Sequence, residues 1–212
     1  MIPIKFLDDV MSLKRIPRSG WTTYRIGKHD IESVSSHSYS VAVIALTMSE
    51  IMRVRKQEVD VEQVLKMALL HDLSESLTFD ISKAYLRYLG RKGSRMKTGL
   101  EEKATSRVLA DLQNDQLADA FRTTIGDYTS SNSLEARIVH CADTLDLLLQ
   151  VIEYERMGYS KTTLDPIWRE TRSKLMTHRL PLANEWSRQL QRARMGLRGK
   201  RRRVGSGSVI VK

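Results

Sequence analysis

Apolar residues recur at helical spacing along most of the chain. The longest such pattern begins near Asn132 and continues to about Met157, and it is apolar nearly all round. This pattern is typical of a buried central helix. Three polar side chains stand in its middle, namely His140, Asp143 and Asp146. A carboxylate among apolar neighbours is costly unless it is paired or bound to a metal, so this helix carries candidate chemistry.

Shorter periodic segments predict further helices, separated by polar breaks and by proline and glycine. Ser33 and Asp60 stand where N-caps are expected, and Gln63 follows Asp60 at the reciprocal position. No strand of consequence is predicted, so the fold class is all-α. Residues 15–33 are expected to be irregular and residues 90–99 to form a mobile loop. The predicted helices span residues 6–14, 33–53, 60–70, 81–89, 100–112, 117–125, 132–157, 162–178 and 182–195.

An apolar run at residues 65–70 leads directly into His71 and Asp72. In a helical continuation, Glu75 would lie four residues after His71 and three after Asp72, so the three side chains share one face. An imidazole nitrogen beside a carboxylate oxygen suits a divalent transition metal. Two ligands do not hold a catalytic ion, so other parts of the chain must supply more.

Two distant residues can complete such a set. His37 lies at the start of a predicted helix and Asp143 lies inside the central one. Each has a simpler interpretation, because His37 suits a solvent-facing, serine-capped turn and Asp143 suits a structural ion pair with an arginine. The irregular segment before them contains Arg18, Trp21 and Arg25, which can bind phosphate or pack on a ligand.

Composition narrows the class of protein. The chain has 212 residues with a single cysteine, Cys141, which excludes an internal disulfide and fits a reducing compartment. No apolar run approaches a membrane span, and acidic residues follow the N-terminus too soon for a signal peptide. We therefore expect a soluble, cytoplasmic protein with one domain over residues 1–195 and a basic, flexible tail over 196–212.

The formal net charge is +10, and no acidic residue follows Glu185. Such a basic end can bind nucleic acid through its phosphates. A solvated, frayed C-terminus is the favoured alternative, because no aromatic residue after Trp186 could stack on a base.

Taken together, these motifs resemble a known family. The order of His37, then the adjacent pair His71-Asp72, then Asp143 is similar to the ligand set of the HD-domain metal-dependent phosphohydrolases. The surrounding residues resemble the 5′-deoxynucleotidase branch of that family. These are Arg18-Ser-Gly-Trp21, Glu32 to Ser38, Glu75, Asp80 and Ala142.

The resemblance implies a bundle of about five core helices followed by C-terminal helices. It implies one divalent cation, with manganese, cobalt, iron, zinc and magnesium as candidates, held by His37, His71, Asp72 and Asp143. It also implies hydrolysis of deoxyribonucleoside 5′-monophosphates by a dimeric enzyme. Two residues depart from the pattern, Ser36 before the first histidine and Phe79 before Asp80, and the second could alter substrate choice.

The resemblance also suggests roles for the remaining candidates. Glu75 would transfer a proton or orient the attacking water, or else fix His71. Asp80 would hold a sugar hydroxyl or water, or else cap a helix. Arg18 and Arg25 would bind phosphate, and Trp21 would pack on the sugar or base or anchor its loop. The alternatives to a nucleotidase are an HD phosphohydrolase of triphosphates or cyclic nucleotides, and a nucleic-acid-binding protein with a secondary metal site.

Overall fold

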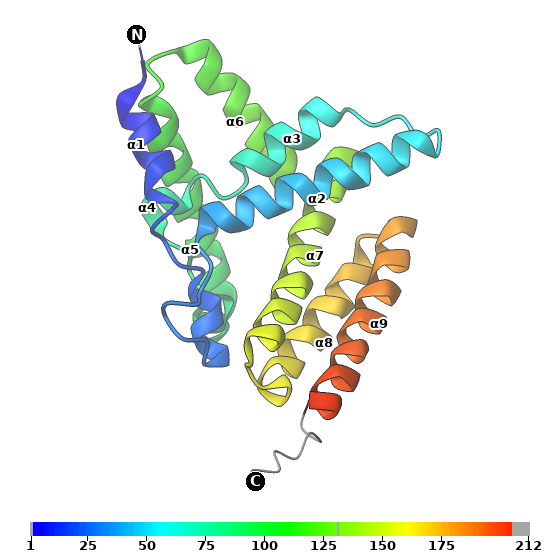
Figure 1. Ribbon diagram of the computed structural model, residues 1–212. Helices are drawn as coiled ribbons and strands as arrows, with labels where there is room; N and C mark the ends of the chain where they lie inside the picture. The colour runs from blue at the N-terminus through cyan, green and yellow to red at the C-terminus, as the bar shows by residue number, and fades with distance from the viewer. Residues whose placement is uncertain (1, 131, 205–212) are drawn as a thin grey trace. The chain divides into compact units, whose positions relative to one another are not determined.

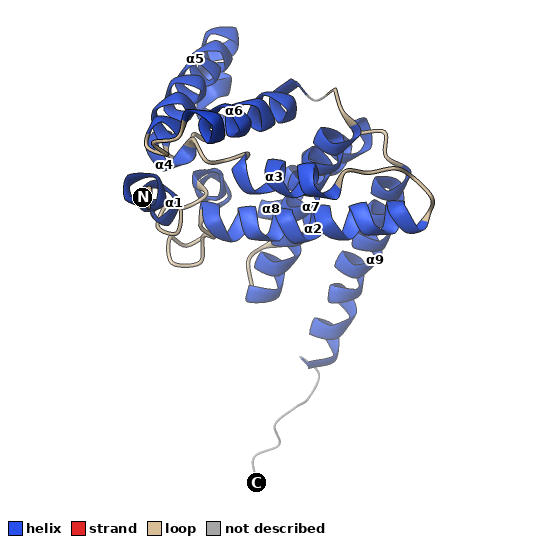
Figure 2. Ribbon diagram, turned by 90° about the horizontal axis from the view of Figure 1, so that it is seen from above, coloured by secondary structure: helices blue, strands red, loops and turns tan. Residues whose placement is uncertain are grey.

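The computed structural model describes residues 2–130 and 132–204, apart from the side chains of residues 83, 84 and 197–204. Within these ranges the secondary structure is helical (Figure 1, Figure 2), and β-pairing is limited to one isolated bridge between Pro17 and Ser33. The predicted all-α fold is confirmed. The elements are α1 (Ile4–Ser12), η1 (Ser19–Tyr24), α2 (Val34–Val54), α3 (Val61–Leu70), α4 (Glu75–Thr78), α5 (Lys83–Ala110), α6 (Asp115–Ser130), α7 (Leu134–Met157), α8 (Lys161–Thr177) and α9 (Pro181–Val204).

The chain forms two compact units, Met1–Asp143 and Thr144–Lys212, and the boundary falls inside α7. The single domain expected over residues 1–195 stays a prediction. None of the helices in the described part of the chain combines the length and the apolar character needed to cross a bilayer.

In the first unit, α2 packs along α3, and α6 contacts both α3 and α5. The predicted caps are present: Ser33 Oγ accepts from the Ser36 amide at 3.2 Å, and Asp60 Oδ1 accepts from the Gln63 amide at 3.0 Å. A buried apolar cluster joins α1, α2, α5 and α6. Its members are Phe6, Leu13, Ile16, Val34, Leu73, Val108, Leu109, Leu112 and Ala118.

The segment expected to be a mobile loop is helical instead. Residues 90–99 lie inside α5, which is kinked at Gly90, where φ is 54° and ψ is −141°. Glycine alone adopts such backbone angles without strain. A Cβ at Gly93 would lie 2.7 Å from Leu89 Cβ, so glycine also allows the turn after the kink to pack closely. The lysines and arginines between the glycines are good helix formers, and Lys97 pairs with Glu101 one turn later at 2.7 Å.

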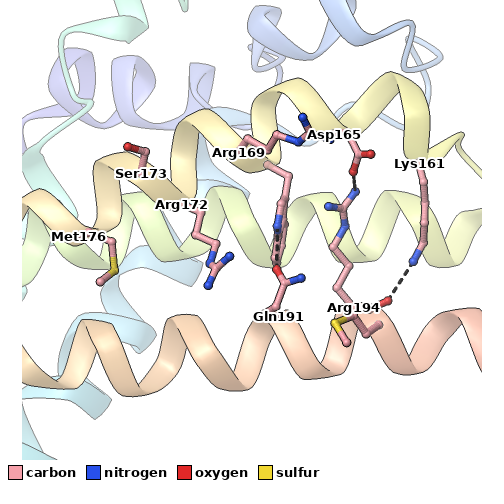
Figure 3. A pocket seen from close by; sticks show the side chains of 10 residues that line it. Lys161, Asp165, Arg169, Arg172, Ser173, Met176, Gln191 and Arg194 are labelled. Carbon is pink, nitrogen blue, oxygen red and sulfur yellow. Dashed lines mark hydrogen bonds and ion pairs between the residues drawn. The ribbon is translucent and has the colours of Figure 1, made fainter.

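In the second unit, α8 and α9 pack together, and Figure 3 shows Asp165 of α8 facing Arg194 of α9. Trp168 Nε1 of α8 donates to Gln191 Oε1 of α9 at 3.1 Å. Arg194 reaches from α9 to two acids, donating from Nε to Glu155 Oε1 at 2.8 Å and from Nη2 to Asp165 Oδ1 at 2.7 Å. Its guanidinium also lies over the Trp168 ring, 4.5 Å from the centroid. Glu155, Asp165 and Arg194 therefore tie α7, α8 and α9 together within this unit.

The last helix is longer than the sequence pattern indicated. It continues from the predicted end at Met195 to Val204, through an acid-free stretch rich in arginine. Arginine and lysine favour helix even without an apolar stripe. The flexible tail predicted over 196–212 therefore overlaps α9, and its residues 205–212 lie outside the described residues.

Candidate metal centre

His37 lies in the first turn of α2, where Ser33 caps the helix. Its side chain is fully buried. His37 Nε2 lies 3.6 Å from Asp72 Oδ2 and 3.4 Å from Asp143 Oδ1. The imidazole therefore points inward at two carboxylates, which excludes the solvent-facing turn offered as its simpler interpretation.

His71 ends α3, and its Nδ1 lies 2.8 Å from the Ala68 carbonyl oxygen. A carbonyl oxygen only accepts, so in the neutral ring Nδ1 carries the hydrogen and Nε2 presents its lone pair. That Nε2 lies 3.4 Å from His37 Nε2 and 3.2 Å from Asp72 Oδ2. The bond to Ala68 already orients the ring, which is the role that the sequence left open for Glu75.

Three of the four residues expected to bind a metal, His37, His71 and Asp72, converge from α2 and the end of α3. Asp143 of α7 joins them through its contact with His37. The donor atoms of His37, His71 and Asp72 lie within 4.8 Å of one another. Atoms that each lie about 2.0–2.2 Å from a common ion are about 2.8–3.1 Å apart in an octahedral arrangement and about 3.3–3.6 Å apart in a tetrahedral one. The separations of 3.2–3.6 Å here lie close to these values. Two imidazole nitrogens and two carboxylates also match the donor types of a divalent transition metal, so the site fits such an ion.

Arg18 lies beside this cluster, and its Nη1 donates to Asp72 Oδ2 at 3.1 Å. Burial by itself would lower the pKa of Arg18, but the charges of Asp72 and Asp143 raise it above its usual range. Burial would likewise raise the pKa of Asp72, but His71 and Arg18 hold it well below its usual range. Both groups are therefore charged at neutral pH, and one guanidinium is fixed at the edge of the centre.

Glu75 opens the short helix α4 and is only 6% exposed. Burial, followed by the charges of Asp72 and Asp80, raises its pKa to about 9. Its Oε2 is buried and has no hydrogen-bond partner among the described residues. Without a bound cation, Glu75 is therefore a protonated acid at neutral pH, and the part of the chain that the structure describes leaves one of its oxygens without a hydrogen bond.

Asp80 joins α4 to the segment that carries Arg18. Its carbonyl oxygen accepts from Ser19 Oγ at 2.6 Å, and its Oδ2 accepts from the Gly20 amide at 3.4 Å.

Trp21 is 2% exposed, and its Nε1 donates to Glu32 Oε1 at 2.9 Å. This geometry is that of a loop anchor, the alternative considered for Trp21.

Arg25 is not brought to the centre by any contact that the structure describes. It ends η1 in the left-handed conformation, with φ of 58°, and its side chain is exposed. A role for Arg25 in phosphate binding stays a prediction.

Comparison with known proteins places the chain in a family. The HD domain family matches residues 10–180. This chain belongs to the HD domain family. A curated relative from Danio rerio, named 5′-deoxynucleotidase HDDC2, is 32% identical over 171 residues, which cover 81% of this chain and 78% of the relative. The Homo sapiens protein of the same name is 28% identical over the same length.

Solved structures agree with the HD-domain fold. A protein from Pyrococcus horikoshii OT3 superposes with a TM-score of 0.70 at 30% identity, covering 89% of this chain and 96% of its own. An HD-domain phosphohydrolase from Listeria innocua gives the same TM-score at 22% identity, covering 84% of this chain and 82% of its own. The second likeness supports the fold alone.

Two residues near the HD-domain centre were not among the predicted site residues, although the basic segment from Arg91 to Lys97 was considered as a cation source for a triphosphate substrate. Lys97 lies in the segment mistaken for a loop, and its charge acts to lower the pKa of Glu75. The spacing of Lys97 and Glu101, one helical turn apart, was the available signal for a helix. Tyr128 lies on α6 with its ring 5.6 Å from that of His71, and nothing in the sequence pattern distinguished it from a surface tyrosine.

Proposed function

We propose that this chain is a metal-dependent phosphohydrolase that removes the 5′-phosphate from deoxyribonucleoside monophosphates. The observation that carries the proposal is the convergence of His37, His71, Asp72 and Asp143, with Arg18 and Glu75 beside them. The substrate class follows from relatives such as the Danio rerio protein, whose name is 5′-deoxynucleotidase.

The two histidines and two aspartates would hold one divalent ion, whose identity stays open. When bound, such an ion supplies Lewis-acid polarisation of the phosphoryl group and activation of the attacking water. Around an ion that takes five or six ligands, four protein ligands with two negative charges would leave room for substrate and water, as a catalytic site requires. The carboxylates of Asp72 and Asp143 also give the site the charge that a divalent cation needs.

Arg18 would bind the phosphate. Its Nη1 is committed to Asp72, and the guanidinium fork has further N–H groups that can donate to phosphoryl oxygens. Phosphoryl transfer depends mainly on positioning and on offsetting charge spread over three oxygens, which a fixed guanidinium does well. Lys97 adds a second positive charge near Glu75, although its Nζ also pairs with Glu101 at 2.7 Å.

Glu75 would give its proton to the departing 5′ oxygen of the sugar. That oxygen leaves poorly as an alkoxide, and a positioned acid contributes about 10²–10⁴-fold. Burial, which is the largest cause of the raised pKa of Glu75, favours the acid form that this step needs, and Glu75 Oε2 has no hydrogen-bond partner among the described residues. In the balanced reaction, water adds to phosphorus, the bond between phosphorus and the 5′ oxygen breaks, and the proton of Glu75 ends on the deoxynucleoside. The proton that the attacking water releases then returns to the Glu75 carboxylate, so the products are a deoxynucleoside and hydrogen phosphate.

Asp80 would act mainly by holding the segment of Arg18 against α4, through its contacts with Ser19 and Gly20. Trp21 would support the same segment from its buried position. The expected homodimer and the cytoplasmic location belong to the proposal as predictions.

The test is phosphate release by the purified full chain, supplied with manganese or cobalt, from a panel of deoxy- and ribonucleoside 5′-monophosphates. We expect release from the deoxy compounds and much less from the ribo compounds. The same panel includes nucleoside triphosphates and cyclic nucleotides. Hydrolysis of these compounds in preference to the monophosphates would favour the alternative HD phosphohydrolase. No release from any compound by metal-loaded protein would reject the proposed class.

A further inference from the structure

His140 lies on α7 one turn before Asp143 and is held against Tyr128 of α6 in two ways. Its ring stacks on the Tyr128 ring, with centroids 4.1 Å apart and planes inclined by 26°. Its Nε2 lies 2.9 Å from the Tyr128 carbonyl oxygen. Because that oxygen only accepts, Nε2 carries a hydrogen and donates it.

The hydrogen bond from His140 to the Tyr128 carbonyl oxygen lies at the C-terminal end of α6. Tyr128 is among the last residues of this helix, which ends at Ser130, and the last four carbonyls of a helix have no intrahelical partner. His140 therefore caps α6 from a different helix. The bond is directional, so it fixes the position of α7 against the end of α6 in a way that apolar packing would not.

Tyr128 also faces the metal centre. Its ring lies edge-on to that of His71 with centroids 5.6 Å apart, and the His71 ring lies 5.5 Å from that of His37. A continuous row of ring contacts thus runs from His140 through Tyr128 to both histidines of the centre. Each ring in the row comes from a different part of the chain: α7, α6, the end of α3, and α2.

We propose that Tyr128 and His140 are positioning residues for the metal centre. His140 sets the place of α7 so that Asp143, one turn on, reaches His37, and Tyr128 limits the rotation of the His71 ring. This inference rests on the proposed function in so far as the centre binds a metal. Such sites require their ligands to be held within about 0.5 Å, which isolated side chains on three helices do not achieve unaided.

The experiment measures metal affinity of the full chain by competition with a chelator, without substrate. We expect Tyr128→Leu and His140→Leu to weaken binding by about 10–100-fold, as loss of an outer partner of a ligand typically does. Tyr128→Phe keeps the ring and should bind within a few-fold of wild type. His140→Gln keeps an N–H donor and should recover part of the loss seen with His140→Leu.

Phe121→Leu is the matched control, because Phe121 is also an aromatic residue of α6 but packs on Phe6, at a centroid distance of 6.3 Å. It should lower the melting temperature and leave metal affinity unchanged. If the two leucine variants lower only the melting temperature and bind metal like wild type, the inference is wrong.

If the leucine variants fail to fold, His140→Phe tests the inference instead, because it keeps a ring at this position and removes the N–H donor to the Tyr128 carbonyl oxygen. Weakened metal binding by this variant supports the inference, and unchanged binding overturns it. Absence of phosphate release by the metal-loaded wild-type chain would reject the proposed function alone, because the affinity ratios that decide this inference do not depend on turnover.

Discussion

Asp143 Oδ1 lies 3.4 Å from His37 Nε2, so a carboxylate from the middle of α7 meets an imidazole from the first turn of α2. His37 is fully buried, and the aspartate is partly exposed. This pair adds the two further candidate ligands that the proposed metal centre needs beside His71 and Asp72.

Replacing Asp143 tests this contribution. Asp143→Ala removes one of two negative ligands, so we expect metal content and phosphate release to fall together, activity by more than about 100-fold. Elemental analysis of the purified variant beside wild type provides the measurement. Asp119→Ala, on the exposed surface of α6, is the control and should retain both. Full metal content in Asp143→Ala would remove Asp143 from the ligand set.

Replacing Arg18 separates phosphate binding from metal binding. Arg18→Ala should lower kcat/KM by about 10²–10³-fold, because a fixed charge that stabilises the phosphoryl oxygens is lost. Metal content should remain near wild type, since the proposed ligands are intact. Arg15→Ala removes a nearby exposed arginine and should change little. Loss of metal in Arg18→Ala would mean that Arg18 acts only by holding Asp72.

We expect the buried Glu75 carboxyl to make the free energy of unfolding depend on pH. Burial, then Asp72 and Asp80, raises its folded-state pKa from 4.5 to about 9, so the folded state favours the protonated form. Its stabilising contribution is complete below about pH 4.5 and is lost progressively as the pH rises towards 9. Relative to wild type, Glu75→Gln should therefore gain stability across this window, by up to about 3 kcal/mol at pH 7.

The measurement is chemical unfolding of chelator-treated protein from pH 5 to 9, because a bound cation would change the charge around Glu75. The same variant should lose phosphate release by about 10²–10⁴-fold if Glu75 supplies the leaving-group proton. A variant whose stability follows the wild-type pH profile would show that Glu75 is not buried in its acidic form.

We expect replacement of Phe79 by glycine, next to the candidate site, to stabilise the protein. It is 64% exposed and has φ of 57° and ψ of 168°, angles that are strained for any residue with a Cβ. Relief of about 1–3 kcal/mol of strain by Phe79→Gly should exceed the roughly 0.5–1 kcal/mol of added chain entropy. The melting temperature should rise by about 2–4 °C for each kcal/mol gained.

Phe79→Ala is the matched control, because it also removes the ring but keeps the Cβ and therefore the strain. Differential scanning calorimetry of the three proteins provides the comparison. Equal melting temperatures for the glycine and alanine variants would contradict the strain.

The sequence by itself determined the helices and the identity of the candidate residues. Periodicity and capping gave α2, α3 and α7 nearly to their ends, because Ser33 and Asp60 act within one turn of their own helices. The same local reasoning failed at residues 90–99, where three glycines suggested a loop although the backbone needs positive φ only at Gly90.

Only the tertiary structure decided how the candidates are used. In the tertiary structure, the His71 ring contacts the Ala68 carbonyl and Trp21 is buried. One oxygen of Glu75 has no hydrogen-bond partner within the described ranges, and Lys97 and Tyr128 lie near the centre. The physical reason is the distance along the chain over which each effect acts. Helix propensity and capping act over a few residues of the chain, whereas burial, pKa and the meeting of donor atoms depend on which distant helices pack together.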